Sequence, residues 1–160
     1  MLRAAGPVVL AAFALSACSV SGLDFRADDR LTITDPPDRS AVTVPFDVSW
    51  TLADQHPDER QFAVLVDASP PRPGAPITDL LPPSQQNARS CDAACQTAAL
   101  EARGVYVTDA TSLQIPVLPR PTGVSAERAR RHTVTVIVLD DQGRRVGEVA
   151  DSVDVDEEYR

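Results

Sequence analysis

The sequence predicts an all-β domain in which antiparallel strands form a sandwich, and three observations lead to that prediction. Hydrophobic residues make up 43% of the 160-residue chain but aromatic residues only 4%, so valine, isoleucine and leucine must fill the core. Valine falls in short clustered runs, which favours strands over helices. Seven such runs are separated by turn residues, a spacing typical of a sandwich.

The first two strand signals lie between residues 30 and 52. Residues 30–34 alternate polar and apolar side chains and end at an Asp-Pro-Pro-Asp turn. From Val42 to Leu52 every even-numbered residue is hydrophobic, which predicts a strand with one apolar face. Pro45 interrupts this run, and we expect an edge position or a bulge there because proline donates no ladder hydrogen bond.

The middle of the chain combines a buried strand with an insertion at residues 69–104. Residues 62–66 are continuously hydrophobic, as expected of a central strand buried on both faces. Residues 69–83 contain six prolines and predict an extended segment with little regular structure. Residues 84–103 predict a helix, with Gly104 as its C-terminal cap.

Strand signals resume after the insertion. They cover residues 105–107, 112–118, 132–139 and 144–155. The segment between the last two ends in Gly143, whose freedom to adopt a positive φ predicts a hairpin turn at residues 140–143.

The order of these features resembles an immunoglobulin-like or fibronectin type III-like domain. The resemblance rests on the strand with Val48, Ser49 and Trp50, on the buried run that follows it, and on the closing hairpin. It implies that residues 30–158 form a sandwich of about seven strands, with one short helical insertion. Such domains often carry a tyrosine near the start of the penultimate strand. This chain has His132 there, so an imidazole would have to supply the corner hydrogen bond.

The amino terminus carries an export signal. Arg3 precedes an apolar stretch at residues 4–17, which is too short to span a bilayer but fits a secretory leader. The stretch ends in Leu15-Ser16-Ala17-Cys18, which resembles the lipobox of bacterial lipoproteins. The resemblance implies removal of residues 1–17, attachment of lipid to Cys18, and a tether at residues 18–29. An ordinary secretory signal with a chance cysteine is the alternative.

The lipobox resemblance also implies a location and a kind of function. A chain held by lipid on Cys18 lies on the extracytoplasmic face of the cell membrane, or in the outer membrane of a cell that has two. The expected function is a non-catalytic binding or structural module for an envelope protein or a glycan, with residues 69–104 as the contact element. An accessory subunit of an assembly or transport complex is the alternative, and a thiol redox protein or a hydrolase is a further one. All 15 basic residues are arginine, and the combination resembles uncharacterised lipoproteins of GC-rich bacteria, which carry no known activity.

Cys91 and Cys95 are the two cysteines that remain once Cys18 carries lipid. In an oxidising compartment we expect them to form a disulfide, and positions i and i+4 of a helix lie within disulfide reach. So short a ring would clip the insertion locally. A redox couple and a zinc site are the alternatives, although thiol oxidoreductases usually separate their cysteines by two residues.

Charge and the remaining polar residues argue against several function classes. A net charge of −8 disfavours nucleic acid as a partner. His56 and His132 have no catalytic partner that the sequence identifies, so we expect neither enzymatic activity nor a cofactor. Acidic clusters are expected to form solvated faces, with calcium binding at the sandwich ends as the alternative. The clusters comprise Asp24, Asp28 and Asp29; Asp140 and Asp141; and Asp151, Asp154, Asp156, Glu157 and Glu158.

Overall fold

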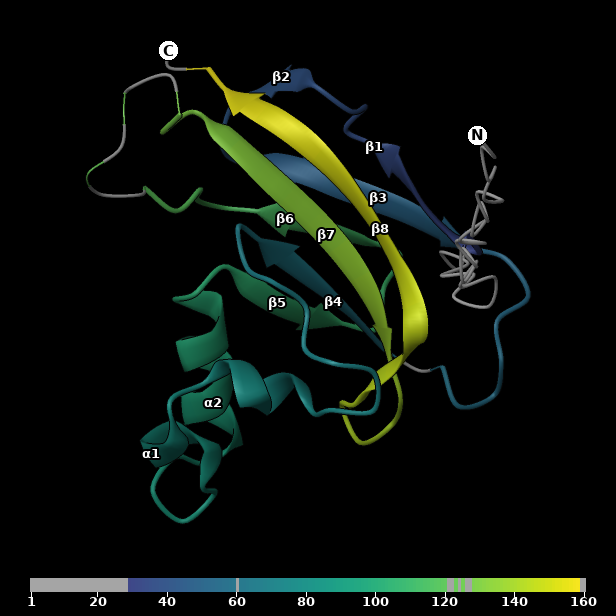
Figure 1. Cartoon of the computed structure of the whole chain (residues 1–160), viewed down its shortest axis with the longest axis vertical. Helices are drawn as coiled ribbons and strands as arrows, with labels where there is room; N and C mark the ends of the chain where they lie inside the picture. Colours follow the sequence, from purple (N-terminus) through teal and green to yellow (C-terminus); the bar gives the residue numbers. More distant parts are fainter. Residues whose placement is uncertain (1–28, 60, 121–122, 124, 126–127, 159–160) are drawn as a thin grey trace, which may run out of the picture.

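A computed structural model describes residues 29–158 of the chain, apart from residues 60, 121–122, 124 and 126–127. This part of the chain forms eight strands, one 3-10 helix and two short α-helices (Figure 1). The strands are β1 (Leu31–Asp35), β2 (Ser40–Val42), β3 (Phe46–Leu52), β4 (Gln61–Val66), β5 (Val105–Thr108), β6 (Ser112–Ile115), β7 (Arg131–Leu139) and β8 (Arg145–Glu157). The helices are the 3-10 helix η1 (Ile77–Leu80), α1 (Pro83–Gln86) and α2 (Ala93–Glu101).

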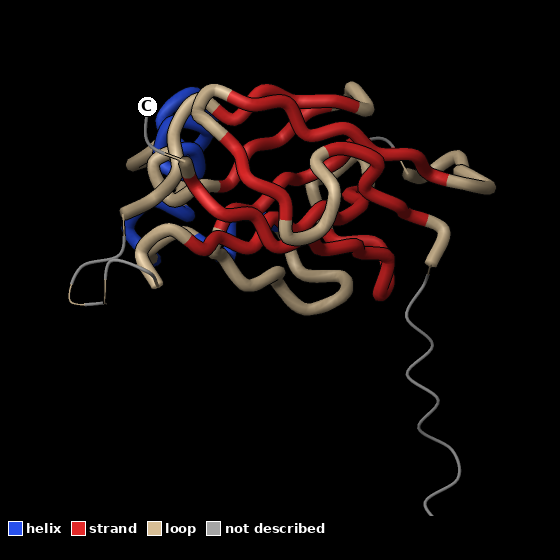
Figure 2. The backbone as a smooth tube through the Cα atoms, turned by 90° about the horizontal axis from the view of Figure 1, so that it is seen from above, coloured by secondary structure: helices blue, strands red, loops and turns tan. Residues whose placement is uncertain are grey.

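The strands form two sheets. One sheet has three strands in the order β1-β3-β6, and the other has five in the order β2-β8-β7-β4-β5. Neighbouring strands are antiparallel except for the parallel pair β2 and β8. The helices gather on one side of the strands (Figure 2). The prediction of a mostly β chain with two sheets is therefore confirmed.

Hydrophobic side chains from both sheets meet in one core between them. Val48 and Trp50 of β3 are 0% and 2% exposed, and they share this core with Val64 and Val136 of the larger sheet. The rings of Trp50 and Phe62 contact edge to face across the two sheets, with centroids 5.3 Å apart. The apolar face predicted from the even-numbered residues is the face that β3 buries.

The buried run at residues 62–66 is a central strand, as predicted. β4 lies between β7 and β5, and all five of these residues are buried. Phe62, Val64 and Val66 point into the core between the sheets. Ala63 and Leu65 point the other way, into a second apolar cluster beneath the insertion. A strand covered on both faces needs no polar alternation, which explains its continuous hydrophobic sequence.

The single strand predicted for residues 42–52 is wrong, because the chain changes sheets at Pro45. Residues before the proline pair with β8, where Val42 lies opposite Glu157. Residues after it pair with β1 and β6 of the other sheet. Val42, Val44 and Phe46 still contact the same core. The even-numbered pattern therefore continues across a change of sheet, and the strand count is eight instead of about seven.

Residues 69–83 of the insertion contain more regular structure than the sequence predicts, and residues 84–103 contain less helix. Ile77 of η1 and Leu81 pack with Leu100 of α2 against the outer face of the five-stranded sheet. The N–H groups of Gly74 and Ile77 donate to the carbonyls of Arg145 and Gly143, so the proline-rich segment is joined to the β7–β8 hairpin. The predicted helix at residues 84–103 is interrupted between α1 and α2 at residues 87–92.

The long edge of β8 is covered by polar contacts from the first part of the domain. The N–H of Ile33 in β1 donates to the Asp151 carboxylate over 2.8 Å. Further along β8, the N–H of Asp154 donates to the Asp38 carboxylate, and β2 then pairs with the last residues of β8. Backbone groups at an exposed sheet edge invite pairing with other chains, and these contacts protect this edge.

Candidate functional site

The predicted leader, Cys18 and the tether lie outside the described residues, except for Asp29. Asp24 and Asp28 of the first acidic cluster also lie outside them. Within the part of the chain that the structure describes, no helix has the length and hydrophobicity needed to cross a membrane. The lipid attachment of Cys18 therefore stays a prediction from sequence.

The predicted disulfide is present between Cys91 and Cys95, whose Cα atoms are 5.2 Å apart. The expectation that both cysteines lie on one helix is wrong, because α2 begins at Ala93 and Cys91 precedes its N-cap, Asp92. The Asp92 carboxylate accepts a hydrogen bond from the Cys95 N–H over 2.9 Å. Cys91 is buried and Cys95 exposed. The disulfide and the cap together fix the first turn of α2.

His132, which the sequence analysis considered as a source of a corner hydrogen bond, contacts Asp67 just after the end of β4. Its Nδ1 lies 2.7 Å from the Asp67 carboxylate, which also accepts the N–H of Thr133 over 2.9 Å. The His132 side chain is fully buried, and its Nε2 contacts no hydrogen-bond partner. The imidazole therefore joins β7 to the residue that follows β4, and it presents neither ring nitrogen to solvent.

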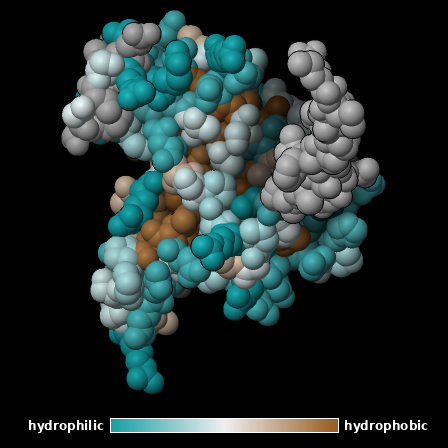
Figure 3. Space-filling model, viewed as in Figure 1, coloured by the Kyte–Doolittle hydropathy of each residue, from teal (hydrophilic) through white to brown (hydrophobic). Residues whose placement is uncertain are grey.

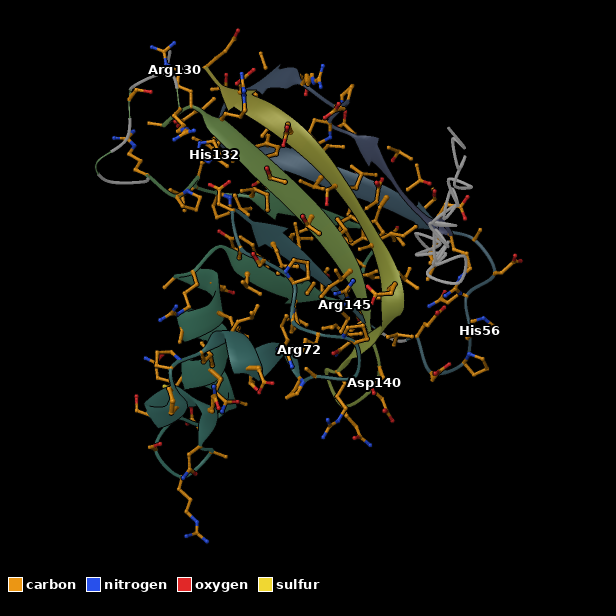
Figure 4. The ribbon with its side chains drawn as sticks, in the orientation of Figure 1. His56, Arg72, Arg130, His132, Asp140 and Arg145 are labelled. Atoms are coloured by element: carbon orange, nitrogen blue, oxygen red, sulfur yellow. A yellow bond between two sulfur atoms is a disulfide. The ribbon has the colours of Figure 1, made fainter. Side chains whose placement is uncertain are left out.

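His56 lies in the loop between β3 and β4, far from His132 (Figure 4). Sequence reasoning missed the residue that organises this loop, Glu59, whose side chain is 0% exposed. The Glu59 carboxylate accepts two hydrogen bonds from the Arg30 guanidinium, at 2.8 and 3.2 Å, and one from the His56 N–H at 2.8 Å. The structure thus separates the two histidines and gives the His56 loop a structural ion pair.

Several of the predicted acidic faces bind backbone groups of the chain itself. Asp140 accepts the N–H groups of Gln142 and Arg144 inside the hairpin turn, and Asp151 accepts that of Ile33 in β1. Among the described residues, no three or more histidine, cysteine, aspartate or glutamate side chains gather closely enough to hold a metal ion. These carboxylates therefore fix turns and edges.

Among the described residues, four of the surface clefts offer space for a ligand. One lies beside α2 and β5, with a volume of about 420 Å³, and is lined partly by Tyr106, Glu101 and Val117. Burial, and to a lesser extent the charge of Glu101, raises the pKa of Tyr106 above its ordinary value of 10. A second, of about 400 Å³, lies between residues 67–70 and β7. A third, of about 320 Å³, lies at the His56 loop.

The fourth cleft, at about 530 Å³, is larger than the other three and lies where β8 ends beside β2 and the start of β7. Its lining consists of Ala41, Arg130, Arg131, Asp156, Glu157 and Glu158. Hydrophilic residues cover this end of the molecule (Figure 3). Arg131 and Asp156 form an exposed ion pair 3.7 Å apart at its rim.

Glu157 is the unusual member of this lining because it is only 6% exposed. Its N–H donates to the Arg130 carbonyl over 2.7 Å, which fixes the end of β8. Its carboxylate oxygen Oε2 is buried and has no hydrogen-bond partner. Sequence analysis placed Glu157 in a solvated acidic face, and that expectation is wrong for this residue.

No family model matches the chain, and no curated protein does either. Among solved structures, the chain is similar to an endo-β-1,4-mannanase from Thermotoga petrophila, with 14% identity and a TM-score of 0.40. That similarity covers 88% of this chain and 22% of the mannanase chain. A likeness at this TM-score carries no argument about fold or activity.

Proposed function

We propose that this chain is a membrane-anchored extracytoplasmic lipoprotein whose immunoglobulin-like domain binds a partner without catalysing a reaction. The lipobox at residues 15–18 is the observation that carries the anchor. A lipid chain contributes about 0.8 kcal/mol for each methylene that it buries in the bilayer, so two or three chains on Cys18 would hold the domain stably.

The strand order supports the immunoglobulin-like assignment. In immunoglobulin domains the strands named A, B and E share one sheet, and C, F and G share the other. The sheet of β1, β3 and β6 corresponds to A, B and E, and the adjacent strands β4, β7 and β8 correspond to C, F and G. Three features depart from the constant-type pattern: β2 pairs in parallel with β8, β5 adds a further strand beside β4, and no described strand pairs with the free edge of β6.

The position of the 530 Å³ cleft at the end of β8 supports a binding surface that faces away from the membrane. The described domain begins next to Arg30, and Ile33 contacts β8 at Asp151. Glu157 lies six residues further along β8, a separation of roughly 20 Å along an extended strand. A tether that ends near Arg30 would therefore attach at the opposite end of the sandwich from the cleft at the end of β8.

Cell fractionation tests the anchor. The full chain and a Cys18→Ser variant are produced in a bacterium that processes lipoproteins, and both are located by immunoblotting after the membranes are washed with high salt. We expect the wild-type chain in the membrane fraction and the variant in the soluble fraction or uncleaved. Equal distribution of the two chains, both with residues 1–17 removed, would contradict the proposal.

A further inference from the structure

Tyr106 of β5 is mostly buried, but its hydroxyl has no partner. Its ring packs in the core between the sheets, and the residue is only 8% exposed. The hydroxyl makes no hydrogen bond to another described residue, and it is not among the unpaired polar atoms that are sealed from solvent. Tyr106 lines the cleft of about 420 Å³ beside α2 and β5, and none of the other three clefts. The unpaired hydroxyl therefore opens into that cleft.

The electrostatic surroundings of Tyr106 suit a hydrogen-bond donor. Burial, and to a lesser extent the charge of Glu101, raises the pKa of Tyr106, and Glu101 lines the same cleft. The phenol therefore stays protonated at neutral pH and can donate a hydrogen bond. A mostly buried donor that lacks an acceptor, at the surface of a cleft, indicates a ligand that supplies one.

The walls around this hydroxyl are mostly apolar. Val117, Leu118 and Pro119 come from the segment that follows β6, and Gly104 comes from the turn that precedes β5. Val117 is 60% exposed, so an apolar group in the cleft would remove hydrophobic surface from water. A sugar fits less well, because its hydroxyl groups would lie against these apolar walls without partners.

Charge and position narrow the occupant further. Glu101 and Arg120 give the lining one charge of each sign, which favours an uncharged group. β1 and β6 form opposite edges of the smaller sheet, and the cleft lies on the side of β5 and β6. A tether that ends before β1 would therefore attach across the sandwich from the cleft, which favours an envelope protein over bilayer lipid as the occupant.

We infer that the cleft beside α2 and β5 binds a leucine-like side chain of a partner protein, and that the Tyr106 hydroxyl donates to the backbone carbonyl beside that side chain. Val117, Leu118 and Pro119 supply the apolar contacts, and the phenol supplies the single directed hydrogen bond. This combination of apolar walls and one donor matches a peptide unit that carries an apolar side chain.

This inference deepens the proposed binding function, and its test is independent of the anchor. The full chain is purified from whichever cell fraction contains it, labelled with ¹⁵N, and titrated with Nα-acetyl-leucine methylamide. The control ligand is Nα-acetyl-glycine methylamide, which has the same backbone without the apolar side chain. We expect saturable shifts of the Gly104, Tyr106 and Val117 amide signals with a Kd on the order of 10 mM for the leucine ligand, and no saturation for the glycine ligand.

A matched pair of exposed valines tests the walls of the cleft. Val117→Thr should weaken binding of the leucine ligand by about threefold or more, because it replaces a methyl group of the wall with a hydroxyl. Val107→Thr makes the same change at a residue that is 40% exposed and lies outside the cleft, and it should alter the affinity by less than about twofold. Both side chains are exposed, so we expect both variants to fold.

Tyr106→Phe tests the hydroxyl and keeps the ring in the core. It should weaken binding by about three- to tenfold, the effect of one lost hydrogen bond, and unchanged affinity would overturn the role of the hydroxyl. No saturation with the wild-type chain, equal shifts with both ligands, or equal effects of the two valine variants would overturn the inference as a whole. The valine variants decide the matter even if Tyr106→Phe does not fold. A lipidated chain that does not bind would refute this site alone, and an unlipidated chain that binds would refute the anchor alone.

Discussion

Substitution of Glu59 by glutamine should destabilise the domain strongly, although Glu59 lies in a loop. Its carboxylate is fully buried and accepts three hydrogen bonds, two from Arg30 and one from the His56 N–H. Removing one partner of a buried ion pair costs about 3–5 kcal/mol. The Arg30 side chain is 21% exposed and would regain some hydration, so we expect a loss of about 2–4 kcal/mol.

Urea denaturation measures this loss, and Asp156→Asn is the matched control. The Asp156 pair with Arg131 spans 3.7 Å between side chains that are 50% and 63% exposed, so its removal should cost less than about 1 kcal/mol. With a slope of about 2 kcal/mol per molar urea, the midpoint should fall by about 1–2 M for Glu59→Gln and by less than about 0.5 M for the control. Equal midpoints for the two variants would refute the reasoning from burial.

Three further predictions concern the insertion and its surroundings. Gly104→Ala should destabilise the domain by more than about 2 kcal/mol, because the residue has φ +73° and the added Cβ would lie 2.8 Å from the Val66 carbonyl oxygen. Gly74→Ala is the control, since this residue has a similar φ of +77° but open space around it, and it should cost about 1 kcal/mol in the same urea denaturation assay. Cys91→Ser should lower stability by about 2 kcal/mol or less, because the disulfide closes a very short ring, and calorimetry that shows loss of the whole folding transition would contradict this. Glu101→Gln should lower the raised pKa of the Tyr106 phenol because it removes the charge of Glu101, while burial of the phenol keeps the pKa above 10. A spectrophotometric titration in which the pKa of Tyr106 does not change would contradict the contribution of Glu101.

The elements that sequence predicts well are those whose pattern depends on burial alone. β4 and β7 are long apolar runs because both strands lie inside the larger sheet and are covered on both faces. Residues 42–52 show the limit of this approach. Side-chain alternation reports which face is buried, but not which sheet receives the hydrogen bonds, so the change of sheet at Pro45 does not interrupt the pattern.

The helix prediction failed for a local reason that the sequence contains. Asp92 precedes an alanine-rich run and is a favoured N-cap residue, and its side chain caps α2. An N-cap at Asp92 predicts a helix that begins at Ala93 and leaves Cys91 outside it. The preceding prolines, Pro82 and Pro83, likewise mark the start of a separate short helix, α1.

The candidate site was only partly accessible from sequence. Alternation along β8 places Glu157 on the same face as Val153 and Val155, so its burial could have been predicted from that spacing. The Arg30–Glu59 pair could not, because its partners are 29 residues apart and meet only when β1 packs beside the loop after β3. The lack of a hydrogen-bond partner at the buried Oε2 atom of Glu157 is equally a property of the folded chain.

Intact mass spectrometry of the chain extracted from membranes, with and without reduction, tests the central claim most directly. The account predicts a polypeptide that begins at Cys18 and carries acyl chains, and whose mass rises by about 2 Da when the Cys91–Cys95 disulfide is reduced. A chain that retains residues 1–17 or that lacks acyl groups would contradict the lipid anchor.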